Sequence, residues 1–156
     1  MISLALHFLT ILTLMAIAYQ DHKERRVYLF LLIFFIIEGA ALFLLEVSQY
    51  MFLIYSLINL SVLAIMMGVL VLYSKYIMRK PFFKEAFGLG DLLFLFAMAL
   101  SFATIEFLTF LVFSIFFSLL LYWVNRNRKF NTVPLAGYSG LFLCMVYVVK
   151  ASNSYG

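Results

Sequence analysis

The chain has 156 residues, of which 67% are hydrophobic and only 12% are charged. A soluble domain of this size needs a largely polar surface, so the composition excludes a soluble globular protein and predicts an integral membrane protein. The apolar runs are continuous and do not alternate with polar residues, which predicts membrane-spanning helices. The single cysteine, Cys144, excludes an internal disulfide and any cysteine-based zinc site.

The apolar stretches predict six membrane spans joined by short polar connections. Residues 86–124 are too long for one crossing, because at roughly 1.5 Å per residue they exceed the roughly 30 Å hydrocarbon core. The polar cluster at Thr104 and Glu106 is therefore expected to divide them. No polar segment is long enough to fold separately, so residues 1–156 are expected to form a single all-α transmembrane domain. The predicted spans cover residues 2–19, 27–45, 50–73, 86–104, 107–124 and 133–149.

The basic residues predict the orientation of these spans. Every Lys and Arg except Lys150 follows the first, third or fifth predicted span. The positive-inside rule makes that side cytoplasmic, so both termini are expected to face outward. Residues 75–84, in which basic and aromatic side chains interleave, are typical of an interfacial helix that contacts anionic lipid. Topology thus accounts for the basic residues, and no nucleic-acid binding is expected.

Two aspartates are predicted to reach this cytoplasmic border at the same depth. Asp21 follows the first span, and Asp91 opens the fourth. A carboxylate at the edge of a bilayer is costly unless it is paired, hydrated or used in function. Two close carboxylates titrate as a coupled unit and can hydrolyse a peptide bond: the ionised one activates a water, and the protonated one polarises the carbonyl. Gly88 and Gly90 lack side chains, so we expect the substrate backbone to approach closely there.

The same aspartates have a purely structural interpretation. Asp21 then belongs to a charged loop, and Asp91 caps a helix N-terminus. The protein would in that case be a non-catalytic polytopic membrane protein, such as an assembly factor or a small transporter subunit. His22, Glu24 and Glu85 are candidates for tuning the pair or contacting a basic segment of a substrate, with solvated surface roles as the alternative.

The sequence Gly88-Leu89-Gly90-Asp91 resembles the Gly-x-Gly-Asp signature of intramembrane aspartyl proteases. The length, the six spans and the earlier Asp21 are similar to type IV prepilin peptidases and archaeal preflagellin peptidases, in their short form without the methyltransferase insert. The residues after Asp21 keep the family's basic and aliphatic pattern, with Tyr28 in place of its proline. The segment Val133-Pro134-Leu135-Ala136-Gly137 resembles the family's proline-containing opening of the last span.

Presenilin and signal peptide peptidase share Gly-Leu-Gly-Asp, and a protease of their kind is the alternative within the protease class. They have more spans and a Tyr-Asp pair at the first acid, where this chain has Tyr19-Gln20-Asp21.

The resemblance to prepilin peptidases implies a membrane-embedded aspartic endopeptidase of type IV pilus assembly or secretion, with Asp21 and Asp91 as catalytic residues. Its substrates would be prepilin-like proteins with a short basic leader, cleaved at the cytoplasmic membrane border. It implies a multi-pass protein in the inner (plasma) membrane of a prokaryote. Neither a metal nor an organic cofactor is expected. Glu38, in the second span, is expected to make a structural polar contact at a depth that His7 and Asn59 also reach.

Overall fold

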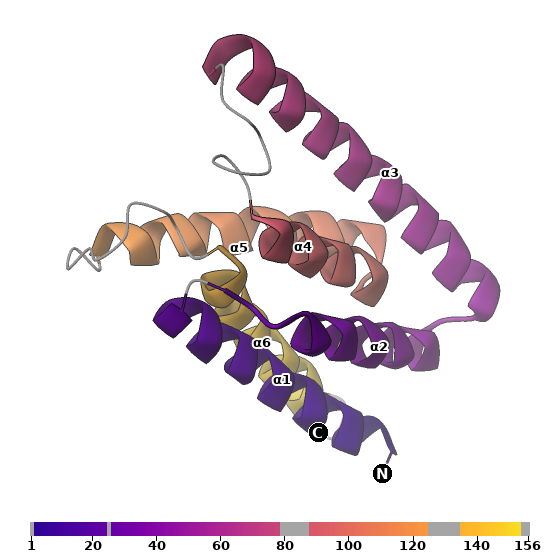
Figure 1. Ribbon diagram of the computed structural model, residues 1–156. Coiled ribbons are helices and arrows are strands. Elements are labelled where there is room, and N and C mark those ends of the chain that lie inside the picture. The colour runs from indigo at the N-terminus through magenta and orange to yellow at the C-terminus, as the bar shows by residue number, and fades with distance from the viewer. Residues whose placement is uncertain (1, 25, 79–87, 125–134, 154–156) are drawn as a thin grey trace.

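The computed structural model describes residues 2–24, 26–78, 88–124 and 135–153. The predicted all-helical class is confirmed for these residues, since they form six α-helices and one π-helical turn. Five of the α-helices are long and apolar enough to cross a membrane; α4 is shorter. The elements are α1 (Ile2–Glu24), α2 (Leu29–Glu46), α3 (Gln49–Tyr73), η1 (Ser74–Met78), α4 (Leu89–Ser101), α5 (Thr104–Val124) and α6 (Leu135–Asn153), as Figure 1 shows.

The observed helix bounds correct the predicted ones in two places. The charged stretch after residue 19 is not a loop, because α1 continues through it to Glu24 and carries Asp21 in its last turns. The break expected near Thr104 and Glu106 lies at Phe102 and Ala103, and Thr104 already begins α5. Helix α4 therefore has 13 residues and is only roughly 20 Å long at 1.5 Å per residue. Because both residues of the break are apolar, the pattern of polar residues in the sequence does not mark its position.

Neighbouring helices are packed so that α1 ends where α2, α4 and α6 begin. Helix α6 runs antiparallel to α1 in the most extensive interface of the bundle, and α2 packs against both α1 and α4. Gly137 at the start of α6 lies against Asp21 near the end of α1, and Gly140 lies against the Leu14 carbonyl. In Figure 1, α3 crosses the bundle at an angle and extends away from it at its C-terminal end. The shared end of α1, α2, α4 and α6 is where the candidate site lies.

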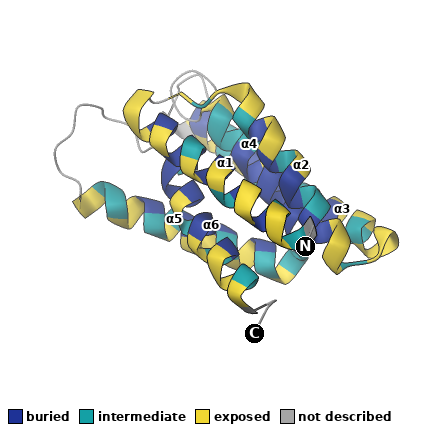
Figure 2. Ribbon diagram, turned by 90° about the horizontal axis from the view of Figure 1, so that it is seen from below, coloured by how far each residue is buried: buried dark blue, intermediate teal, exposed yellow. Residues whose placement is uncertain are grey.

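The outer surface of the bundle is strongly apolar. Figure 2 shows buried residues on the helix faces that meet one another and exposed residues on the outer faces. The outer faces carry large hydrophobic side chains, including Phe8, Ile65 and Trp123, each more than 60% exposed. An apolar surface of this extent marks a molecule whose surroundings are themselves apolar. Together with the five long apolar helices, it supports a multi-pass membrane protein.

Several polar side chains inside the bundle bond to one another or to nearby backbone groups. Glu38 is buried in α2, and its Oε1 accepts a hydrogen bond of 3.1 Å from the Thr13 hydroxyl of α1. This is the expected structural contact between helices, although its partner is neither His7 nor Asn59. The His7 ring nitrogen Nδ1 instead lies 2.8 Å from the Ser3 carbonyl oxygen of its own helix.

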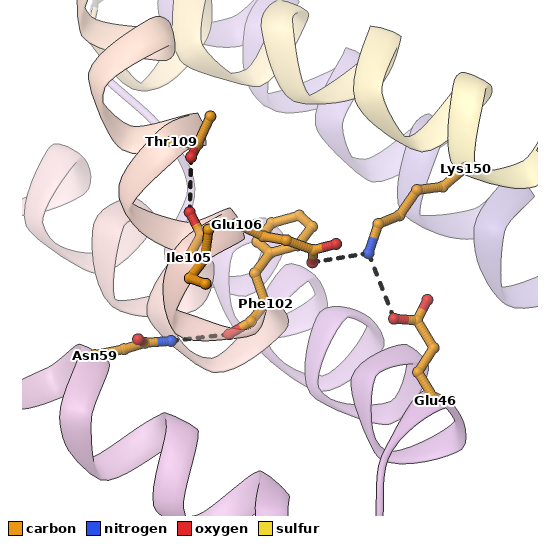
Figure 3. Close-up of polar contacts among 7 residues, drawn as sticks. All are labelled: Glu46, Asn59, Phe102, Ile105, Glu106, Thr109 and Lys150. Carbon is orange, nitrogen blue, oxygen red and sulfur yellow. Dashed lines mark hydrogen bonds and ion pairs between the residues drawn. The ribbon is translucent and has the colours of Figure 1, made fainter.

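Asn59 of α3 stabilises the C-terminal end of α4, which lies before the predicted end of this span. The Asn59 Nδ2 group donates a hydrogen bond of 2.9 Å to the Ala99 carbonyl. It donates a second one, of 2.8 Å, to the Phe102 carbonyl (Figure 3). The last carbonyls of a helix have no partner within the helix, and burial without one is costly. At the same end of the bundle, Lys150 of α6 contacts Glu106 at 3.1 Å and Glu46 at 3.4 Å (Figure 3). At the end opposite the candidate site, Asn59 thus joins α3 to the end of α4, and Lys150 joins α6 to α2 and α5.

We predict that Asn59→Leu lowers the free energy of unfolding by about 1–3 kcal/mol, because two buried carbonyls lose their donor. Unfolding in mixed micelles of increasing SDS content measures the change. Ser61→Ala is the matched control, since the Ser61 hydroxyl is exposed and bonds only to the Leu57 carbonyl of its own helix. Equal stability of the two variants would contradict the capping role of Asn59.

Candidate active site

Asp21 and Asp91 line the same pocket, although 69 residues of sequence lie between them. Asp21 is 6% exposed, and the Asp91 side chain is half-buried. The charges of the two carboxylates are close enough to interact electrostatically. The pocket has a volume of about 380 Å³, and its walls are formed by Asp21, Arg26, Val27, Gly88, Leu89, Gly90 and Asp91.

Consecutive backbone amides at the start of α6 hold the two carboxylates. The Ala136 N–H donates a hydrogen bond of 2.8 Å to Asp91 Oδ1. The Gly137 N–H donates one of 2.6 Å to Asp21 Oδ2. Both amides belong to the first turn of α6, whose N–H groups have no partner within the helix. One helix terminus therefore places both acids side by side.

Opposing electrostatic effects act on this pair. Burial and mutual repulsion disfavour two ionised carboxylates at this distance. Hydrogen bonds from backbone amides and the positive ends of helix dipoles favour negative charge, each dipole by about 0.3–1 kcal/mol. Three helices, α2, α4 and α6, begin at this end of the bundle. These effects oppose one another at the pair, and aspartyl hydrolysis requires a pair that carries one negative charge and one proton.

The glycines of the Gly-Leu-Gly-Asp segment have different surroundings. Gly88 is the N-cap of α4, and its backbone forms a hydrogen bond with the Asp91 carboxylate three residues later. A Cβ on Gly88 would lie 3.2 Å from Asp91 Oδ2, so a side chain there would disturb the carboxylate. A Cβ on Gly90 would meet only Val27 Cβ, at 3.9 Å, which is ordinary van der Waals contact. The fold therefore has room for a methyl group at Gly90, so a role for this glycine would concern the substrate.

Gly137 has little room for a side chain. A Cβ at this position would lie 3.0 Å from both Cβ and Oδ2 of Asp21 and 3.4 Å from the Ala18 carbonyl oxygen. Such contacts are tighter than nine in ten real Cβ contacts, so α1 and α6 would have to move apart by a few tenths of an ångström. The absence of a side chain thus allows the Gly137 amide to reach Asp21.

Two other residues predicted for the site, His22 and Glu24, lie outside the pocket. His22 and Glu24 are exposed on the last turn of α1, and the His22 ring lies 6.2 Å from the Tyr138 ring of α6. Glu85 lies outside the residues that the structure describes. The pocket instead includes Arg26, Val27 and Leu89, which the sequence analysis did not single out. Only the proximity of Arg26 and Val27 to Asp21 in the sequence pointed to them.

The described residues contain no group of three or more His, Cys, Asp or Glu side chains arranged to hold a metal ion. The reactive groups that this pocket offers are two carboxylates. Such a pair can activate a water and polarise a carbonyl group.

Comparisons with protein-family models, with curated proteins and with solved structures find no match for this chain. Any assignment of function therefore depends on the short motifs and on the geometry of the pocket.

We predict that Gly137→Ala lowers the free energy of unfolding by about 1–3 kcal/mol, the usual cost of overpacking a close contact. Gly68→Ala is the control, because a Cβ at Gly68 would meet nothing within 4 Å; it should be neutral or stabilising by about 0.5–1 kcal/mol. Titration with SDS of both variants in mixed micelles provides the comparison. If Gly137→Ala were as stable as Gly68→Ala, the close approach of α6 to Asp21 would be wrong.

Proposed function

We propose that this protein is a membrane-embedded aspartic endopeptidase of the prepilin peptidase type. The observation that carries the proposal is that Asp21 and Asp91 line one pocket while each accepts a hydrogen bond from one of two consecutive amides of α6. A pair of helix-end residues with separate structural roles has no need to meet. The Gly-x-Gly-Asp motif at residues 88–91 adds independent support.

The proposed reaction uses one proton shared by the two carboxylates. The ionised carboxylate takes a proton from a water molecule while the water oxygen attacks the scissile carbonyl carbon. The protonated carboxylate donates its proton to the carbonyl oxygen, giving a neutral tetrahedral diol. Collapse of the diol breaks the C–N bond, and a proton passes to the leaving amine. The amides of Ala136 and Gly137 keep both carboxylates in place throughout.

The proposed substrate is a prepilin-like protein with a short basic leader ahead of a hydrophobic helix. In the proposed topology both termini face outward, and the end of the bundle that carries Asp21 faces the cytoplasm. Lys23 and Arg26 lie at this end, as the positive-inside rule requires. The pocket would then open at the cytoplasmic border of a prokaryotic plasma membrane, where a leader joins its hydrophobic helix.

We predict that reporter fusions after Lys129 report a cytoplasmic location and fusions after Lys150 an external one. The reason is that Lys and Arg concentrate on one side of the spans, which orients them. A fusion after Gln49 should also be external, because one further span separates it from the cytoplasmic Arg26. The reverse pattern would contradict the proposed topology and the cytoplasmic opening of the pocket.

We predict that Asp21→Asn and Asp91→Asn each abolish leader cleavage and that the double variant loses little more. The residues of one catalytic unit are strongly non-additive, whereas independent sites give effects that add. Cleavage of co-expressed candidate prepilins, compared at equal membrane abundance, is the measurement.

Glu24→Gln is the matched control for these variants, because Glu24 is an exposed carboxylate on the same helix end but outside the pocket. It should leave cleavage unchanged. Substantial cleavage by either single Asn variant would contradict the two-aspartate mechanism and favour the non-catalytic alternative.

A further inference from the structure

Gln20 joins the end of α1 to the start of α2 through a single hydrogen bond. Its side chain is 9% exposed and directly precedes Asp21 in the sequence. Gln20 Oε1 accepts a hydrogen bond of 3.0 Å from the backbone N–H of Tyr28. Tyr28 is the N-cap of α2, so this bond closes the connection that runs from Asp21 back into the bundle.

The connection closed by this bond forms one wall of the pocket. Arg26 and Val27 lie within it and line the pocket opposite the segment that carries Asp91. Val27 faces Gly90, since a Cβ on Gly90 would lie 3.9 Å from Val27 Cβ. Gln20 thus acts on both sides of the site. It directly precedes Asp21 in the chain, and through its bond to Tyr28 it fixes the neighbouring Val27, which faces the segment before Asp91.

The backbone conformation at position 28 also suits a proline, but Tyr28 has an N–H that can donate to Gln20. Its dihedral angles, φ −66° and ψ 132°, are those that a proline adopts readily. A proline would fix this φ by its ring but has no N–H to donate. The Tyr28 side chain is 54% exposed and stacks on Phe30 at 5.7 Å, so it takes no part in the pocket wall. The hydrogen bond from the Tyr28 amide to Gln20 therefore restrains the backbone at this position, as the ring of a proline would.

We propose that Gln20 is a positioning residue, which holds the pocket wall of Arg26 and Val27 against the segment that carries Asp91. Its effect on the position of the wall stands on the geometry alone. Its effect on cleavage rests on the proposed aspartic endopeptidase function.

The position of the wall can be tested without any assay of activity. A separation of 3.9 Å between Cβ atoms lies within the range for a disulfide, about 3.5–4.5 Å. Val27→Cys with Gly90→Cys should therefore form a disulfide under mild oxidation, in a Cys144→Ala background that leaves no other cysteine. Adding Gln20→Met, which keeps the side-chain length and removes the acceptor, should slow disulfide formation at least tenfold. An unchanged rate in Gln20→Met would overturn the proposal.

Two variants of Tyr28 separate the hydrogen bond from other effects. Tyr28→Ala keeps the N–H and removes the ring, so disulfide formation should be unchanged. Tyr28→Pro removes the N–H and fixes φ, so Gln20→Met should slow the reaction no further in that background. A tenfold additional loss in the Tyr28→Pro background would show that Gln20 acts through another partner and would overturn the proposal. If Tyr28→Pro fails to fold, the comparison of Gln20→Met with Tyr28→Ala decides the question.

Cleavage kinetics, with native residues at positions 27, 90 and 144, test the catalytic consequence. Gln20→Met should lower kcat at least tenfold and change KM little, because a displaced wall alters the geometry of the reacting groups more than the binding of a leader. Tyr28→Pro should restore kcat in the Gln20→Met variant. Slower disulfide formation with unchanged kcat would overturn the positioning role in catalysis. Absence of cleavage by the unmodified protein would contradict the proposed function, while the disulfide rates would still decide the role of Gln20.

Discussion

The site depends on two hydrogen bonds, from the Ala136 amide to Asp91 and from the Gly137 amide to Asp21. Without them, two carboxylates would be brought together against their repulsion and against the cost of burial. The first turn of a helix offers amides with no other partner, and its dipole favours negative charge on the carboxylates. The position of α6 is therefore the constraint on which the pocket depends. Gly137 and Gly140 let α6 approach α1 closely enough to satisfy it.

The rest of the bundle holds these helix ends in register. Helix α4 is shorter than the five long apolar helices, and Asn59 donates hydrogen bonds to carbonyls at its C-terminal end. Lys150 links α6 to α2 and α5 through Glu46 and Glu106 at the far end. With the far ends joined, the starts of α4 and α6 are fixed beside the end of α1. The polar contacts far from the pocket thus support its geometry through the helices between them.

Much of this architecture follows from the pattern of apolar residues, and the parts that do not follow depend on tertiary contacts. The apolar runs predict the long helices, and the sides on which basic residues fall place Asp21 and Asp91 together. The sequence predicts that the first span ends at residue 19, because charged residues follow it, whereas α1 continues through Asp21 and His22 to Glu24. The break predicted near Thr104 lies slightly earlier, at Phe102, because Asn59, a residue distant in the sequence, bonds to the backbone there. The amides of Ala136 and Gly137 carry no sequence signal of their own, since every residue except proline has an N–H. The role of Gln20 is hidden for the same reason, because its partner is the backbone of Tyr28.

The central claim is that Asp21 and Asp91 form one coupled pair at the N-terminus of α6. The most direct test is a pH titration, followed by NMR in micelles, of the Ala136 and Gly137 amides. Each amide proton bonds to one of the two carboxylates, so its chemical shift reports their ionisation. The account predicts that both amides shift over the same pH range. It also predicts that Asp91→Asn changes the titration seen at Gly137, and Asp21→Asn the titration seen at Ala136, because coupled groups titrate as a unit. Independent titrations, each unaffected by replacement of the other aspartate, would contradict the account.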